Sequence, residues 1–206
     1  IGATYDIEKA GIEIVNINGV SFDHFANLFN NADSTKNLQT RCALITDDDR
    51  KEIAEDPSAR INNVTALNGG TLKTFIGAVT FEYELFLASN ENRELLLSIY
   101  RDFHSNTEIP VNADIQIYSK TFADKVKSQK GKSELALRLA THLENGFELN
   151  KAFANQAISD APLNEDAFLA TLEEPDQADY KAYKNFTVPN YIQRAIKYAV
   201  KGEIDV

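Results

Sequence analysis

Residues 41–52 read RCALITDDDRKE, a short apolar run that ends in three consecutive aspartates. An almost uninterrupted apolar run of this length is typical of a strand covered on both faces of a parallel sheet. Asp47, Asp48 and Asp49 follow the run directly. Carboxylates placed this close repel one another unless water or a cation lies between them. The stretch therefore predicts a buried strand that ends either in a solvated acidic turn or in a cation site.

The segments before this strand predict an α/β fold. Residues 11–19 alternate apolar and polar side chains and end in Asn-Gly, as a strand followed by a turn does. Residues 21–30 repeat phenylalanine and leucine on one face of a helix. A strand, a helix and a strand in this order form a right-handed βαβ unit with parallel strands. We expect a small parallel sheet flanked by helices.

The rest of the chain divides into predicted elements of both kinds. In order, these are a short helix and loop over 50–63, a strand over 73–80, a helical insertion over about 82–104, a strand or ordered connection over 113–119, a basic loop and amphipathic helix over 127–146, a loop-rich, acidic region over 147–186, and a helix after Pro189. The predicted organisation is one domain over 1–146 and a loop-rich and helical C-terminal extension over 147–206. Exposed aromatic residues in the extension, Tyr180, Tyr183 and Phe186, would permit a homodimer interface.

Composition narrows the class of protein. The chain has 206 residues and a formal net charge of −10, which disfavours sequence-independent binding to nucleic acid phosphates. It does not exclude a nuclease, because bound divalent metals offset the charge of an acidic site. No apolar stretch reaches the roughly 18 residues of a membrane span, and no signal peptide opens the chain. A single cysteine excludes an internal disulfide and a thiolate zinc site. We expect a cytoplasmic protein that does not bind membranes.

Three acidic residues are predicted to share one edge of the sheet. Asp47 and Asp49 follow one strand, and Glu82 follows the next at the start of a helix; the carboxyl ends of parallel strands are where ligands bind in open α/β sheets. Carboxylate oxygens suit Mg²⁺ or Mn²⁺. In extended geometry Asp48 should point away and tolerate replacement, and Glu84 should also point away. Alternatively, the aspartates are a solvated turn and Glu82 only complements the helix dipole.

Lysines before the helix over 127–146 are the other candidates. Lys130 precedes Gly131 and a helix start, where a lysine can neutralise a phosphate, and Lys132 ranks second. A solvated basic loop is the alternative. The chain has no Walker A loop and no Gly-x-Gly-x-x-Gly, so we expect no nucleotide site of either type.

Four short motifs together resemble the C-terminal Toprim region of the OLD (overcoming lysogenization defect) family. They are EIVNINGVSFDHFANLFN, RCALITDDD, TFEYELFLASN and KGKSELALRLA, and the resemblance is strongest over about 11–145. The segment FTVPNYIQRAIKYAV is similar to the end of many such chains. Members are ATP-dependent, RecF-like endonucleases, some of which act in phage defence. The resemblance implies a Toprim fold and a two-metal DNA nuclease.

The resemblance also implies roles for single residues. Asp47 and Asp49 match the family's Asp-x-Asp, Glu82 its strand-end glutamate and Lys130 its lysine before glycine. Asp47, Asp49 and Glu82 would bind Mg²⁺ or Mn²⁺, and Lys130 would act in catalysis with the two aspartates. Lys132, Glu84 and Asp48 are weaker candidates.

One element of the family is not matched. Its Toprim region begins with a strand ending in a Glu-Gly-like motif, and nothing before Gly11 resembles it. The chain has no methionine and begins with Ile1, so we expect a fragment that lacks this catalytic glutamate and an upstream ATPase domain through which ATP would act. Such a fragment should cleave DNA weakly or not at all.

Two other functions fit the same residues. The fold could serve as a non-catalytic dimerisation or partner-binding module with a vestigial acidic cluster. An Asp-x-Asp phosphatase would use the first aspartate as nucleophile, which leaves Glu82 without a role.

Overall fold

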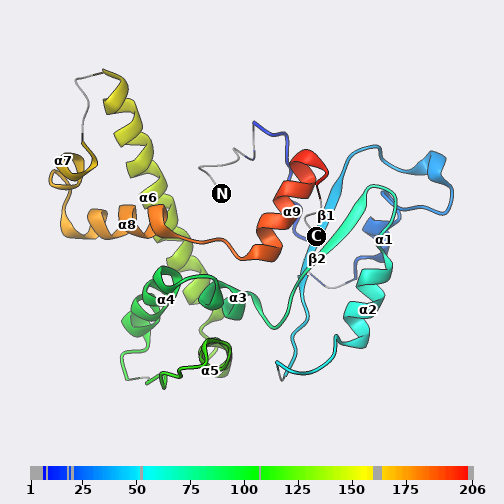
Figure 1. Ribbon diagram of the computed structural model, residues 1–206, viewed down its shortest axis with the longest axis horizontal. Helices are drawn as coiled ribbons and strands as arrows, with labels where there is room; N and C mark the ends of the chain where they lie inside the picture. Colours follow the sequence, from blue (N-terminus) through cyan, green and yellow to red (C-terminus); the bar gives the residue numbers. More distant parts are fainter. Residues whose placement is uncertain are drawn as a thin grey trace. The chain divides into compact units, whose positions relative to one another are not determined.

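The computed structural model describes residues 7, 9–17, 19, 21–51, 53–106, 108–159 and 164–203. The chain forms two compact units, shown in Figure 1. The first unit combines Ile1–Glu84 with Val188–Val206, and the second comprises Leu85–Thr187. Residue 146, the predicted domain boundary, lies within the second unit. The last helix belongs with the sheet, although it is far from the sheet in sequence.

The first unit contains a two-stranded parallel sheet. Strand β1 (Cys42–Asp47) pairs with β2 (Leu72–Gly77), and helix α2 (Ala59–Ala66) lies between them in sequence. Asp47 is the register partner of Gly77, so the two strands end together. The predicted parallel α/β sheet is confirmed. Its βαβ unit, however, is β1–α2–β2 rather than the expected unit over residues 11–46.

Helices cover both faces of this sheet (Figure 1). On one face, α9 (Asn190–Lys201) packs Ala195 and Tyr198 against Phe75. On the other face, Leu44 packs with Phe22 and Val64. The run over 42–46 forms a strand as predicted, but its expected cover on both faces is incomplete: only Leu44 is buried, and Ile45 is 42% exposed.

The N-terminal predictions for the first unit are largely wrong. Residues 12–17 form no strand, and Ile14 and Val15 are 78% and 65% exposed. The helix predicted over 21–30 is reduced to α1 (Asp23–Ala26), followed by the 3₁₀ helix η1 (Ser34–Lys36). Alternation of apolar residues forms a strand only when a neighbouring strand accepts its hydrogen bonds. No described strand pairs with residues 12–17.

The second unit is helical. It contains α4 (Asn90–Phe103), α5 (Ile115–Ser128), α6 (Lys132–Ser159), α7 (Glu165–Leu169) and α8 (Glu174–Asn185), together with the end of α3 (Phe81–Ala88). Aromatic residues contribute to its core: Phe86 stacks on Phe122 with 4.4 Å between ring centroids, and Tyr100 packs against the ring of Phe122. The helical insertion after residue 82 is confirmed by α3 and α4.

Two predictions for this unit are wrong. Residues 113–119 belong mostly to α5, and most of the loop-rich region over 147–186 is helical in the part that the structure describes. Pro175 lies in the first turn of α8, where proline favours a helix because the missing N–H would have no intrahelical partner. Tyr180 is not exposed: it is 1% accessible and packs against Phe168.

Glycine allows α6 and α8 to approach closely. A Cβ added to Gly146 would lie 2.5 Å from the Cβ of Tyr183, a distance that requires one helix to move. Periodicity within α6 does not reveal this requirement, because it comes from the partner helix. In the described residues, no helix combines the length and apolar composition needed to cross a membrane.

Candidate functional site

The carboxyl end of β1 carries the predicted acidic residues. After Asp47, the amide of Asp48 donates to the carbonyl of Gly77 at 2.9 Å, and the amide of Asp49 donates to that of Val79 at 2.7 Å. The chain then turns, because Asp49 has a φ of +58°. Asp49 and Lys130 are the non-glycine residues with positive φ in the described part of the chain. Aspartate tolerates this left-handed region better than most residues.

Asp47 is contacted by a residue that is distant from it in sequence. The hydroxyl of Tyr191, on α9, donates to Oδ1 of Asp47 at 3.0 Å. Tyr191 is 8% exposed. Gly77 leaves room for this contact, since a Cβ there would lie 2.7 Å from Asp47 Oδ1 and 3.2 Å from Tyr191 Cζ. The contact therefore requires both the C-terminal helix and a glycine at the end of β2.

The surroundings of Asp47 disfavour its charge. Burial raises the pKa of Asp47 to about 6, against the opposing effect of hydrogen bonds from Tyr191 and the Phe81 backbone. The negative charges of Asp49 and Glu82 raise this pKa further. The assignment of Asp47, Asp49 and Glu82 to one metal centre stays a prediction.

Asp48 points to the other side, as expected, but it is not a free side chain. It is 3% exposed and accepts hydrogen bonds from the Ser58 hydroxyl at 2.6 Å and the Arg50 Nε at 2.6 Å. Burial acts to raise the pKa of Asp48, yet these hydrogen bonds outweigh it and hold the pKa below its ordinary value. Ser58 is also the N-cap of α2. The expectation that Asp48 tolerates replacement therefore conflicts with its surroundings.

Arg60 lies beside the aspartates. Its Nη2 is 3.5 Å from Oδ2 of Asp49 and also donates to the backbone carbonyl of Asp47. Its Nη1 donates to the hydroxyl of Thr46 at 3.3 Å. The Asp49 side chain is 61% exposed, so this ion pair is weak but keeps a positive charge at the acidic edge.

The two glutamates of α3 lie on the same side of the unit as Asp47. Thr80 begins the helix, its Oγ1 accepting from the amide of Tyr83 at 3.4 Å, and Glu82 sits in the first turn, as predicted. Glu84 was expected to point away from the aspartates, but it does not. Its Oε1 accepts from the amide of Ala78 at 2.6 Å, and burial raises its pKa.

Lys130 and Lys132 belong to the second unit. Lys130 follows the end of α5 with a φ of +57°, and the amide of Gly131 donates to the carbonyl of Val126 at 2.9 Å. These features form a Schellman cap, in which glycine usually takes the left-handed position. Lys132 is the first residue of α6. The assignment of either lysine to the acidic centre stays a prediction.

The chemistry of the donors at the sheet edge fits a hard divalent cation. The side chains of Asp47, Asp49 and Glu82 offer only oxygen atoms, and a cation would offset the charges of Asp49 and Glu82, which add to the effect of burial on the pKa of Asp47. The described residues, however, contain no ready-made group of three or more His, Cys, Asp or Glu side chains that could hold a metal ion. A bound ion would therefore require water ligands or side-chain movement.

Tyr191 and Arg60 were missed by reasoning from sequence. Tyr191 belongs to a helix face with Ala195 and Tyr198 at spacings of four and three residues, which indicates a buried face but not its partner. Arg60 lies in a charged segment that predicts only a solvated helix. Neither residue carries a signal for its position beside Asp47.

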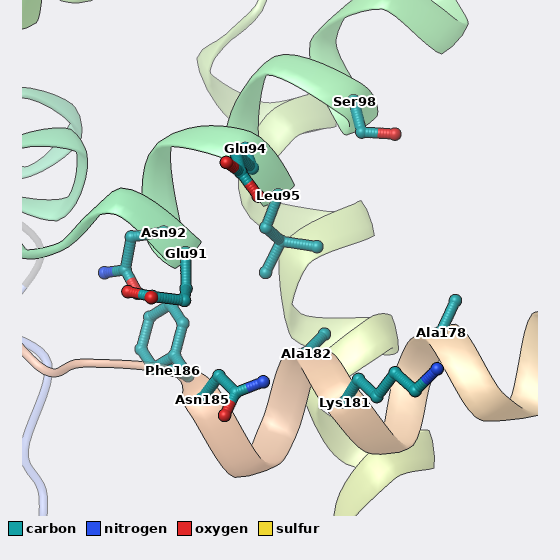
Figure 2. Close-up of a pocket in the computed structure, with 10 residues that line it drawn as sticks. All are labelled: Glu91, Asn92, Glu94, Leu95, Ser98, Ala178, Lys181, Ala182, Asn185 and Phe186. Carbon is teal, nitrogen blue, oxygen red and sulfur yellow. The ribbon is translucent and has the colours of Figure 1, made fainter.

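The second unit has a pocket of its own, between α4 and α8 (Figure 2). It has a volume of about 350 Å³. Leu95 and Ser98 extend from α4, and Ala178, Ala182 and Lys181 from α8. None of the predicted site residues lines it.

Comparison with known proteins found no relative of this chain. The chain matches no protein-family model, no curated protein and no solved structure.

Proposed function

We propose that this chain is the Toprim-like nuclease domain of an OLD-family type, ATP-dependent DNA endonuclease that uses Mg²⁺ or Mn²⁺. The observation that supports the proposal is the placement of Asp47 and Asp49 after the end of β1 and of Glu82 after the end of β2, since the two parallel strands end together. Two of these residues come from the end of one strand and the third from the helix that follows the other. The negative charges of Asp49 and Glu82 add to the effect of burial in raising the pKa of Asp47, and a divalent cation would offset these charges.

Each residue has a role in phosphodiester hydrolysis. Asp47, Asp49 and Glu82 would hold the ions. When bound, the ions lower the pKa of an attacking water and stabilise the leaving oxygen. Lys130 would stabilise the negative charge that develops on the phosphate. DNA is the proposed substrate, and an ATPase domain of the same protein is the proposed partner.

The backbone at two of these residues agrees with a functional role. Asp49 and Lys130 both hold a left-handed conformation that glycine would adopt at lower cost. Such conformations concentrate at functional sites, where the side chain is needed despite the strain. Asp49 and Lys130 are also residues that the sequence predicts for metal binding and catalysis.

The test is metal-dependent nicking of supercoiled plasmid by the full-length protein. We expect the Asp47→Ala and Lys130→Ala variants to lose activity about a hundredfold or more. Asp56→Ala and Lys127→Ala are matched controls, because both residues are exposed and lie outside the proposed centre. Activity unchanged in Asp47→Ala and Lys130→Ala would overturn the assignments.

Two alternatives give different results. A non-catalytic module would show no heat in a calorimetric titration with Mn²⁺ and no effect of Asp47→Asn. A phosphatase would form an aspartyl-phosphate that can be trapped, and it would not depend on Glu82. The pairing of Glu82 with the aspartates favours the nuclease over the phosphatase.

A further inference from the structure

The contact between Tyr191 and Asp47 links the C-terminal helix to the candidate metal centre. The two residues are 144 positions apart in sequence, and the hydrogen bond between them is 3.0 Å long. Asp47 is the last residue of β1, and Tyr191 is the second residue of α9. The carboxylate of Asp47, a proposed metal ligand, is therefore oriented by α9, a helix that carries none of the proposed ligands.

Three other features hold Tyr191 in this position. Its ring is buried, and the bare Gly77 backbone lies against both the ring and the carboxylate. Ala195 and Tyr198 continue the same face of α9 into the core over Phe75. The hydroxyl of Tyr198 donates to the carbonyl of Thr71 at 2.8 Å, at the other end of β2. The helix is thus fixed to the sheet at both ends.

We propose that Tyr191 is a positioning residue through which docking of α9 controls the affinity of the Asp47 centre for divalent metal. The hydroxyl engages one carboxylate oxygen of Asp47 and limits the rotation of its side chain. Groups that orient a metal ligand in this way typically change metal affinity or activity 10- to 100-fold when removed. This inference rests on the proposed function, because it requires Asp47 to bind metal.

The coupling must act in both directions. If docked α9 favours metal binding, bound metal must favour docked α9 by the same factor. Amide hydrogen exchange in α9 would then slow when metal is added. A purely structural tyrosine would not produce this effect.

The experiment compares Tyr191→Phe with Tyr198→Phe in the full-length protein. Each variant removes one hydroxyl from the same face of α9 and keeps the ring. The hydroxyl of Tyr191 donates to Asp47, whereas that of Tyr198 donates to the carbonyl of Thr71. Titration with Mn²⁺ followed by calorimetry gives the affinity, and hydrogen exchange of α9 with and without Mn²⁺ gives the coupling. We expect Tyr191→Phe to bind Mn²⁺ at least about tenfold more weakly and to lose the metal-dependent protection. Tyr198→Phe should retain both properties.

The other outcomes separate the two hypotheses. If the wild-type protein binds no Mn²⁺, the proposed metal centre fails, and this inference fails with it. If the wild-type protein binds Mn²⁺ and the two variants match each other, the metal centre stands and the role of Tyr191 is overturned.

Discussion

At the residue scale, Asp48 has a structural task beside its acidic neighbours. Its carboxylate receives hydrogen bonds from the N-cap of α2 and from Arg50 in the loop that follows β1. It therefore joins the end of the strand to the start of the helix. Asp47 on one side faces Tyr191, and Asp49 on the other side is exposed. Three identical residues in sequence thus have three different environments.

Replacement of Asp48 should cost stability. We expect Asp48→Ala to lower the free energy of unfolding by about 2 kcal/mol or more, because the hydrogen bonds from Ser58 and Arg50 to a buried charged acceptor are lost. The measurement is urea unfolding followed by circular dichroism. Asp56→Ala, an exposed residue of the nearby loop, should stay within about 0.5 kcal/mol of wild type. Equal effects in the two variants would restore the view that Asp48 tolerates replacement.

Much of the candidate site was predictable at this scale. The end of an apolar strand places Asp47 and Asp49 at the sheet edge, and the start of a helix places Glu82 there, because these positions follow from local pattern. Glu84 was assigned the wrong direction, since its contact with the amide of Ala78 depends on the path of the loop after β2. Tyr191 was not predictable, because no local pattern names its partner.

At the element scale, the end of α5 shows a conflict between stability and side-chain chemistry. The cap position after the helix is occupied by Lys130 with positive φ, although Gly131 follows directly. Glycine at such a position would remove the cost of placing a Cβ in the left-handed region. The chain carries a lysine where the local fold favours glycine.

A glycine substitution separates the two effects. We expect Lys130→Gly to raise the free energy of unfolding by about 1 kcal/mol, because the left-handed conformation no longer costs strain. The same variant should lose plasmid nicking if the amino group acts in catalysis. Thermal unfolding and nicking are measured on the same preparation. Lys127→Gly is the control, because that residue lies within the helix and glycine there should destabilise it by up to about 1 kcal/mol. Full nicking by Lys130→Gly would contradict the catalytic role.

Helix boundaries were predicted best where a helix depends on its own sequence. The last helix begins at Asn190, directly after Pro189, as predicted. The region over 147–186 was misjudged because its helices are polar on their exposed sides and apolar only where they pack. Gly146 within α6 illustrates the cause, since it is required by the neighbouring α8.

At the scale of the whole molecule, one buried side chain joins the two ends of the second unit. Asn92 is fully buried, and its Nδ2 donates to the carbonyls of Leu85 at 3.0 Å and Thr187 at 2.7 Å. Its Oδ1 accepts from the amide of Thr187 at 2.9 Å. Leu85 and Thr187 are the first and last residues of this unit. Asn92 therefore closes the unit where the chain enters and leaves it.

Removal of this side chain should destabilise the second unit. We expect Asn92→Ala to lower the free energy of unfolding by about 2 kcal/mol or more, because the carbonyl of Leu85 and the part-buried carbonyl and amide of Thr187 lose this partner. Hydrogen exchange measured by mass spectrometry should show the largest loss of protection in α4, α5 and α6. Asn90→Ala is the control: its exposed side chain donates to Glu94 at 2.7 Å and accepts from Arg93 at 3.4 Å, both on the exposed surface of the same helix. Faster exchange in β1 and β2 alone would contradict this role for Asn92.

The sequence by itself determined the short-range features of this protein. The strands β1 and β2, the helix that begins near Glu82 and the closing helix after Pro189 all follow from patterns among neighbouring residues, whereas the pairing of β1 with β2 does not. Only the tertiary structure decided that Asp48 is buried, that Tyr191 holds Asp47 and that Asn92 closes the second unit. The physical reason is that periodicity reflects interactions along the chain, whereas burial and hydrogen-bond partners depend on residues that are distant in sequence and meet only after folding.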